Sequence, residues 1–142
     1  MMKVFRAQDR DRRLSERDGR RRVDVVTEEM LGITAVQIDI VYNDPGVIGS
    51  PHMHGDADHV FMVIRGSGIA FTDDHTLEVG PGDVYFVPRG EYHWFHNTGT
   101  ELSERLEIWV PAPQETVWRD PDDACAFVPD GHGVLEGDRA PA

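Results

Sequence analysis

The sequence contains little cysteine and no long apolar segment. Among its 142 residues Cys125 is the only cysteine, which excludes an internal disulfide framework and fits a reducing compartment. No apolar run approaches the roughly 20 residues that a helix needs to cross a bilayer. The charged N-terminus is not followed by an apolar stretch, so no secretory signal is expected. Together these absences predict a soluble, cytoplasmic protein without a membrane partner.

Basic residues are also scarce, and they are unevenly distributed. The chain has 14 Lys/Arg against 26 Asp/Glu, a formal net charge of −12, yet residues 1–22 hold nine of the basic and only four of the acidic residues. An acidic body repels phosphate backbones, so nucleic acid is not an expected partner. The three arginines at residues 20–22 would suit a basic arm. We favour a solvated segment that lies across the acidic body of its own chain or of a partner subunit.

The length suits one domain with a single core. Residues 23–111 are rich in Val, Ile and Thr, and turn residues recur about every 8–12 positions, which is typical of an antiparallel sandwich or barrel. Strands are expected at residues 23–30, 32–42, 59–64, 69–72, 76–79, 84–88, 92–97 and 105–111, with no amphipathic helix between them. Residues 1–22 are expected to be an irregular charged segment. Residues 112–142, rich in Pro, Asp and Gly, form a tail that could be mobile, a lid or a dimer strap.

Three of the seven histidines lie within eight residues. Residues i and i+2 of a strand point to the same side, so His52 and His54 project side by side if their segment is extended. Imidazole is the commonest metal-binding side chain, and His59 follows after a short acidic spacer. A His-x-His pair is a weak signal by itself, and the surrounding residues decide its meaning.

Two stretches with regular spacing contain these histidines and His93. The first is GVIGSPHMHGDADHVFMVIRG, residues 46–66, and the second is GDVYFVPRGEYHWFHN, residues 82–97. In the order and spacing of their Gly, His, Pro and Asn residues they resemble the two motifs of the cupin family. The resemblance implies an all-β, single-domain jelly-roll β-barrel over residues 23–111. It also implies a homodimer, with the N-terminal segment and the tail as natural contacts.

The resemblance further implies a metal centre inside the barrel. Carried over to this chain, its ligands are His52, His54, His59 and His93. The family usually has Glu at the position of His59, although a similar subset of small cupins uses four histidines. Asp58 stays an alternative third ligand, but it should point the opposite way if residues 58–63 are extended. One divalent transition metal ion is expected, with iron, manganese or copper favoured and nickel or zinc also suited.

Alternation along the motif strands also predicts the lining of the barrel. If His59 and His93 point inward, then Phe61, Val63 and Phe95 point inward as well. These three side chains are expected to form an apolar wall, which excludes water and strengthens electrostatic interactions at the metal.

The remaining histidines are not expected to be ligands. By alternation His96 faces outward, together with Trp94. His75 lies in a hairpin tip and His132 lies in the tail. Both are therefore expected to lie away from the metal.

Polar groups for a substrate are less clearly indicated. Gln37, Asp39 and Tyr85 lie on candidate barrel strands and could each contact a substrate, but their inward or outward direction stays open. Cys125 is far from any histidine in the sequence and has no signature of a nucleophile. No catalytic residue is assigned, and no general base stands out.

Four imidazoles would leave the charge of a divalent ion uncompensated, which favours an anionic substrate such as a carboxylate or enolate. An octahedral shell would keep two positions open, enough for a bidentate substrate or for a substrate and O₂. The leading hypothesis is a metal-dependent oxygenase or dioxygenase that acts on a small organic molecule. The alternatives are a non-redox isomerase, lyase or polyketide-cyclase-like enzyme, and a non-catalytic module that binds a small molecule or a metal.

Overall fold

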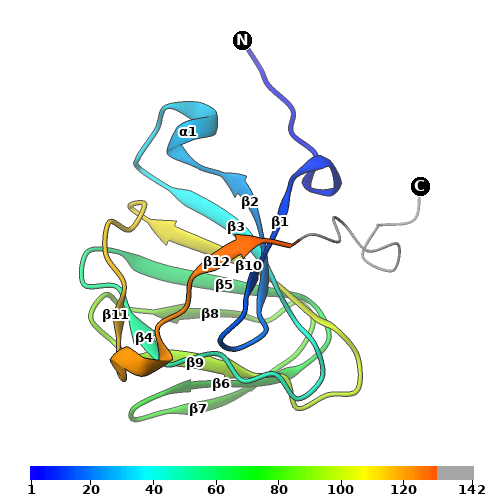
Figure 1. The fold of residues 1–142 in the computed structure, drawn as a ribbon, viewed down its shortest axis with the longest axis vertical. Helices are drawn as coiled ribbons and strands as arrows, with labels where there is room; N and C mark the ends of the chain where they lie inside the picture. Colours follow the sequence, from blue (N-terminus) through cyan, green and yellow to red (C-terminus); the bar gives the residue numbers. More distant parts are fainter. Residues whose placement is uncertain (131–142) are drawn as a thin grey trace.

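The computed structural model describes residues 1–130 as two antiparallel sheets that face each other (Figure 1). The larger sheet has the order β12-β1-β2-β3-β10-β5-β8 and the smaller one the order β11-β4-β9-β6-β7. The large sheet contains β1 (Arg12–Ser15), β2 (Arg21–Val26), β3 (Gln37–Asn43), β5 (Asp58–Arg65), β8 (Val84–Val87), β10 (Ser103–Val110) and β12 (Phe127–Pro129). The small sheet contains β4 (His52–Met53), β6 (Gly68–Thr72), β7 (Thr76–Val79), β9 (His93–His96) and β11 (Val117–Trp118). The predicted all-β jelly roll is confirmed.

Within residues 1–130, helical structure is limited to three short segments. These are η1 (Ala7–Asp9), α1 (Glu28–Leu31) and η2 (Pro121–Asp123). A strand was expected up to residue 30, but the Thr27 hydroxyl accepts a hydrogen bond from the Met30 amide at 3.3 Å and caps α1. Gly32, at φ +70°, ends the helix. Over residues 1–130 no helix is long and apolar enough to span a bilayer.

The N-terminal segment differs from the irregular structure expected for it. β1 and β2 extend the large sheet, and β12 pairs with β1 from the other end of the described chain. Arg12, only 2% exposed, donates to Asp130 at 2.9 Å, and the Arg22 guanidinium lies 4.3 Å from the centre of the Phe127 ring. Arg12 and Arg22 lie on opposite faces of these strands, so arginines occupy positions on both faces. The segment therefore lacks the apolar alternation by which strands are recognised.

The described part of the tail, residues 112–130, is a strap on its own barrel. β11 pairs with β4, which carries His52, and β12 closes onto β1 (Figure 1). Of the three possibilities left open for the tail, the strap fits these residues, although it binds its own chain. The tail and the N-terminal hairpin thus meet over the same end of the barrel.

Strand alternation positions the interior groups. On β5, His59, Phe61 and Val63 are at most 3% exposed, whereas Met62 and Ile64 face solvent. On β10 the inward side chains include both polar and charged groups, namely Ser103, Arg105, Glu107 and Trp109. The adjacent strands β5 and β10 thus present a histidine and charged side chains to the same interior.

Asn97 closes the second motif by satisfying backbone groups. It is fully buried, and its amide nitrogen donates to the carbonyls of Asn43 at 2.8 Å and Glu101 at 2.9 Å. Its side-chain oxygen accepts from the Gly99 amide at 2.9 Å. A single side chain thus holds the turn after β9 against the end of β3, because buried backbone groups need partners.

Candidate metal centre

The four predicted ligands come from both sheets. His52 and His93 are register partners on the adjacent strands β4 and β9, His54 follows β4, and His59 faces them from β5. All four are buried, with exposed fractions of 1% to 8%. A turn-rich connection between β4 and β5 brings the first motif across from one sheet to the other.

Three of these histidines form a group whose ligand atoms all lie within 4.8 Å of one another: His52, His54 and His93. In each, Nδ1 is bonded to a backbone carbonyl, at distances of 2.9 Å, 3.0 Å and 3.1 Å, and the acceptors are Ser50, Glu115 and Glu91 respectively. A carbonyl can only accept, so Nδ1 carries the proton and Nε2 keeps a free lone pair. The backbone therefore fixes the tautomer that metal binding requires.

Burial keeps these imidazoles neutral. Desolvation lowers the pKa of His52 well below its usual value, with a smaller contribution from His93 in the same direction. Desolvation also lowers the pKa of His93 to about 3. A neutral imidazole keeps a lone pair on the nitrogen that carries no proton, as a metal ligand must.

His59 lies against this group without being one of the three. Its Nδ1 is 3.2 Å from Nε2 of His93, and its ring stacks on Trp109 with 4.4 Å between centroids. Two ligand nitrogens at right angles around one ion, each at about 2.1 Å from it, are about 3 Å apart, so this distance suits two neighbouring ligands. The fourth ligand stays a prediction.

An unsatisfied nitrogen tests whether an ion fits here. Nε2 of His54, a member of the group of three, is buried and has no hydrogen-bond partner within residues 1–130. A buried polar atom without a partner costs about 1–3 kcal/mol, so this atom needs something to bind. Neutral imidazole nitrogens suit a divalent transition metal ion. The residues therefore fit such an ion.

The other residues considered as ligands lie elsewhere. Asp58 is held by Arg89, whose Nη2 lies 3.1 Å from its carboxylate, and this contact lowers the pKa of Asp58. His75 is exposed in the β6–β7 hairpin, and His96 is half-buried on the far side of β9 from His93. His132 lies outside the described residues.

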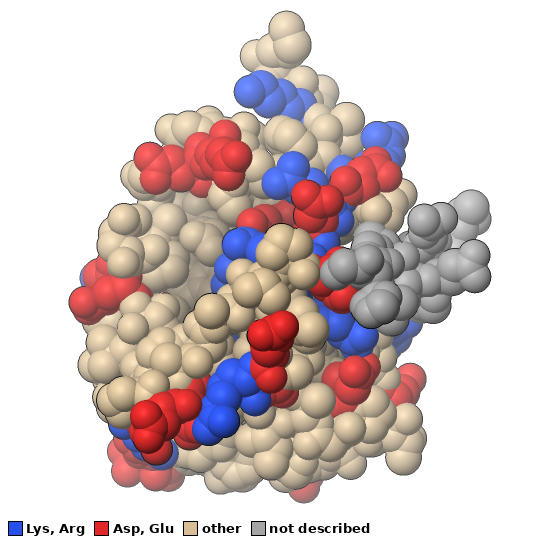
Figure 2. All heavy atoms as spheres, viewed as in Figure 1, with Lys and Arg blue, Asp and Glu red and all other residues tan. Residues whose placement is uncertain are grey.

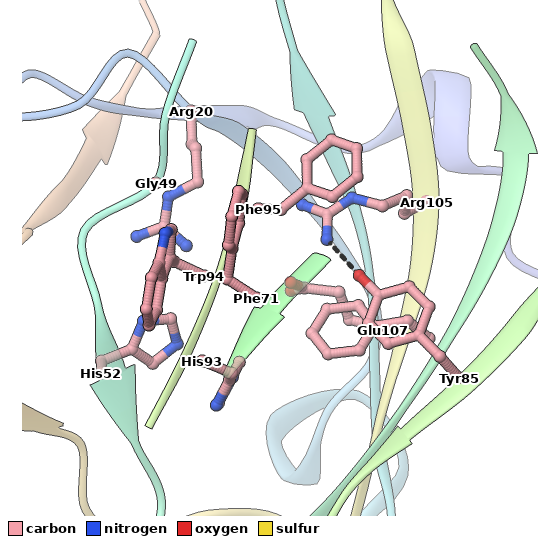
Figure 3. Close-up of a pocket in the computed structure, with 11 residues that line it drawn as sticks. Arg20, Gly49, His52, Phe71, Tyr85, His93, Trp94, Phe95, Arg105 and Glu107 are labelled. Carbon is pink, nitrogen blue, oxygen red and sulfur yellow. Dashed lines mark hydrogen bonds between the residues drawn. The ribbon is translucent and has the colours of Figure 1, made fainter. Parts of the chain in front are cut away.

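A small aromatic pocket with a cavity volume of about 20 Å³ adjoins the histidines (Figure 3). Its lining consists of Arg20, Gly49, His52, Phe61, Phe71, Tyr85, His93, Trp94, Phe95, Arg105 and Glu107. Two members of the expected apolar wall, Phe61 and Phe95, are here. The third, Val63, is buried in the core cluster with Phe95 instead of lining the pocket.

Trp94 alternates with the buried His93 and Phe95 along β9, as expected, and still reaches the rim of the site. It borders the aromatic pocket, because its ring stacks on Phe71, its register partner across β6 and β9, with 5.2 Å between centroids and nearly parallel planes. Arg119 lies 4.8 Å from the ring centre and covers it. Cross-strand stacking thus holds this half-buried ring at the rim of the pocket.

A larger, basic mouth with a cavity volume of about 320 Å³ lies on the other side of the histidines. Its arginines come from the N-terminal hairpin and its aromatic rings from β10 and the tail strap: Arg13, Arg20, Arg22, Trp109, Trp118 and Phe127. Figure 2 shows arginines gathered where the N-terminal strands cross β12, among acidic side chains. The segment expected to be a solvated surface therefore contributes to the candidate site.

Three pocket residues were not found from the sequence: Arg20, Arg105 and Glu107. Arg105 donates to the Tyr85 hydroxyl at 2.7 Å and to the Asn43 side chain at 3.1 Å. The signal available in the sequence was the alternation of residues along β10. That alternation predicts that the apolar Leu106 and Ile108 point inward, but both side chains are less buried than Arg105 and Glu107.

Of the polar residues whose direction was open, Tyr85 lines the aromatic pocket and Asp39 is fully buried on β3. Burial raises the pKa of Asp39 to about 8, although Arg22 lies 3.3 Å away and opposes this shift. Gln37 is half-buried, and its amide contacts the Asp39 carboxyl at 3.4 Å.

Asp39 is expected to make stability fall as the pH rises. The folded chain keeps the Asp39 proton up to about pH 8, whereas the unfolded chain releases it near 3.8, so folding binds a proton between these values. Urea unfolding should show stability declining from pH 5 to pH 8, and Asp39→Asn should remove on the order of 1–3 kcal/mol of that decline. Asp74→Asn, on an exposed hairpin tip, should keep the wild-type slope. An unchanged slope in Asp39→Asn would refute this assignment.

Comparison with known proteins gives the family of this chain. Residues 40–111, about half of the chain, match the cupin domain. The chain belongs to the cupin family. An uncharacterized protein of Aquifex aeolicus (strain VF5) is 36% identical to this cupin over 62 residues, 44% of this chain and 50% of that protein. This cupin spans half or less of the length of the curated relatives that it matches.

Solved structures show the same fold. A sugar phosphate isomerase of Silicibacter pomeroyi superimposes with a TM-score of 0.71 and 21% identity, over 96% of this chain and 99% of that one. The polyketide cyclase RemF of Streptomyces resistomycificus gives a TM-score of 0.71 and 22% identity, over 84% and 87%. At such identities the likeness concerns the fold, and function has to be argued from the site.

Proposed function

We propose that this cupin is a metal-dependent enzyme that converts a small organic anion at its histidine centre. One observation carries the proposal: three buried imidazoles have Nδ1 bonded to backbone carbonyls and their ligand atoms within 4.8 Å of one another. His59 is the proposed fourth ligand. A bound divalent ion would supply positive charge and open coordination positions for a substrate.

The surroundings support a reaction chamber. Phe61 and Phe95 are each 3% exposed and exclude water from one side of the histidines, which strengthens electrostatic interactions there. A purely structural metal site is usually closed and needs no adjoining pocket. Here the histidines separate an aromatic pocket from a basic mouth, and both spaces reach His52.

An anionic substrate is supported by Arg20. This guanidinium is 7% exposed, lines both the aromatic pocket and the basic mouth, and is oriented by Asp18 at 2.7 Å. Asp18 in turn accepts from the Ser50 amide, beside His52. A buried, oriented guanidinium recognises carboxylate or phosphate oxygens, and two of its nitrogens can do so together.

Two reaction types fit this site. Oxygenation needs an ion that binds both substrate and O₂, and the neutral imidazole set suits the redox metals iron, copper and manganese. A non-redox isomerisation or cyclisation needs a proton-transfer group, and the buried carboxyl of Glu107 in the pocket favours this second candidate. Two fold neighbours carry the names of an isomerase and a cyclase. The homodimer and the cytoplasmic location stay predictions.

The test begins with protein purified without a histidine tag, whose metal content and O₂ uptake are measured with a panel of enols, phenols and oxo acids. We expect about one metal ion per chain and turnover that stops when a chelator removes it. O₂ uptake linked to iron, copper or manganese would support oxygenation, whereas conversion without O₂ would support the non-redox reaction. A chain that takes up no metal after reconstitution would overturn the proposal.

A further inference from the structure

We propose that Glu107 is the proton-transfer residue of this site and that the substrate is a carbonyl compound with an acidic C–H and an anionic end. This inference rests on the proposed metal-dependent function. In the step, the Glu107 carboxylate takes a proton from the carbon next to the carbonyl group. The C–H bond breaks, its electron pair forms the C=C bond of an enolate, and the carbonyl oxygen takes the charge. Glu107 then returns the proton to the same carbon or, in a 2-hydroxy carbonyl compound whose hydroxyl proton has moved to the former carbonyl oxygen, to the neighbouring carbon. No oxidant or reductant is consumed.

The position of Glu107 suits this role. It lies on β10, opposite Phe61 of β5 and Asp39 of β3 in register, and its side chain is 6% exposed. Figure 3 shows it pointing from β10 into the aromatic pocket, on the side where His52 and His93 lie. Only Arg20, His52 and Glu107 line both the aromatic pocket and the basic mouth, so a substrate at the histidines borders Glu107.

The Glu107 carboxyl has no committed partner among residues 1–130. The carboxyl is affected by its burial and by the charges of Arg105, Arg20 and Arg22, but it forms no hydrogen bond with these arginines. Two of these arginines already donate to other acceptors, Arg105 to the Tyr85 hydroxyl and the Asn43 side chain and Arg20 to Asp18 at 2.7 Å. Arg22 lies 3.3 Å from Asp39. Glu107 is therefore left to contact a group that enters the basic mouth, which it also lines.

The environment also tunes the carboxyl for proton transfer. Burial raises the pKa of Glu107, and the three arginines oppose that shift. Asp39 and Tyr85, the other titratable groups that interact with Glu107, are buried and would carry negative charge on ionisation. A carboxyl with a raised pKa is a stronger base when ionised and a usable acid near neutral pH, as proton-transfer catalysis requires.

Arg20 gives the substrate its orientation. Its guanidinium lies beside the path from the basic mouth to His52 and can bind the carboxylate or phosphate end. The carbonyl end then faces the histidines, with Glu107 on the side of β10. A substrate with an anionic end and a carbonyl end would contact both groups. This explains why the Arg20 guanidinium and the Glu107 carboxylate are buried beside the same histidines.

The experiment measures solvent deuterium entering three probes: pyruvate, 2-oxoglutarate and dihydroxyacetone phosphate. Full-length, metal-loaded wild type is compared with Glu107→Gln, Glu107→Asp and the matched control Glu104→Gln. Glu104 is half-buried on the same strand and paired with Arg65 at 3.8 Å, away from the pocket. We expect wild type to exchange at least one probe and Glu107→Gln to lose that rate by about 100-fold or more. Glu107→Asp should recover part of it, and Glu104→Gln should match wild type.

Metal content, measured on the same samples, separates the possible failures. If Glu107→Gln keeps its metal and its thermal midpoint but loses exchange, a merely structural role is ruled out. Exchange that persists in Glu107→Gln, or wild type that binds metal yet exchanges no probe, would overturn the role of Glu107 and leave the metal-dependent function standing. Wild type that binds no metal would overturn both.

Discussion

Replacing His93 by alanine is expected to raise the dissociation constant for the metal by about 100-fold or more, since even partners outside the ligand shell contribute 10-fold to 100-fold. His93 lies at the centre of the group. Its ring centroid is 4.5 Å from that of His52, 5.2 Å from that of His59 and 5.8 Å from that of His54. Competition against a chromophoric chelator, with untagged protein, measures the affinity.

Two further variants complete this experiment. His59→Ala separates a three-ligand from a four-ligand centre: a loss of about 10-fold or more supports His59 as a ligand, since it exceeds the scatter of such measurements. Wild-type affinity in His59→Ala would leave the three-histidine group as the whole centre. His75→Ala, in an exposed hairpin, should bind like wild type. Unchanged affinity in His93→Ala would contradict the site itself.

Replacing Gly66 by alanine is expected to destabilise the fold by about 3 kcal/mol or more, because two costs coincide there. Gly66 ends β5 with φ +77°, a conformation that L side chains rarely adopt. An added Cβ would also lie 2.7 Å from the Leu102 carbonyl oxygen and 2.9 Å from the Ser103 Cα. These are backbone atoms at the start of β10 and cannot rotate away. Urea unfolding, monitored by tryptophan fluorescence, measures the change.

Two other glycines separate these costs. Gly82 has φ +88° but open space around the missing Cβ, so Gly82→Ala should cost only about 1 kcal/mol for the backbone conformation. Gly80 has open space and no positive φ, so Gly80→Ala should change stability by less than about 0.5 kcal/mol. If Gly66→Ala lowers the free energy of unfolding by no more than Gly82→Ala does, the close approach of β5 to β10 does not contribute to the loss of stability. Because the pairing of β5 with β10 also places His59 opposite Trp109 and Phe61 opposite Glu107, the same series probes the frame of the site.

The centre proposed here combines neutral ligands with a charged enclosure. The histidines are neutral because burial lowers their pKa values, so a bound cation would keep its charge for the substrate. Arg20 is held by Asp18, whose negative charge limits its repulsion of a metal ion while leaving it able to bind an anion. The N-terminal hairpin supplies Arg20, so a segment outside the matched cupin region takes part in the site.

Local features of the sequence determined the all-β class, most strand positions and the histidines of the two motifs. Strand alternation and turn-forming glycines act over a few residues, so they are legible without the fold. The inward orientation of Phe61 and Phe95 followed from the same alternation. It also made Asp58 the less favoured third ligand, and the pairing of Asp58 with Arg89 agrees with that.

Only the tertiary structure decided the rest, because it depends on pairs that are distant in the sequence. On β10 the charged Arg105 and Glu107 point inward and the apolar Leu106 is more exposed, the reverse of the usual pattern, since this interior contains a polar chamber. β1 and β12 are strands because they pair with each other over more than 100 residues, with Leu14 opposite Val128. Composition shows neither feature, since each strand is stabilised by partners that folding alone brings together.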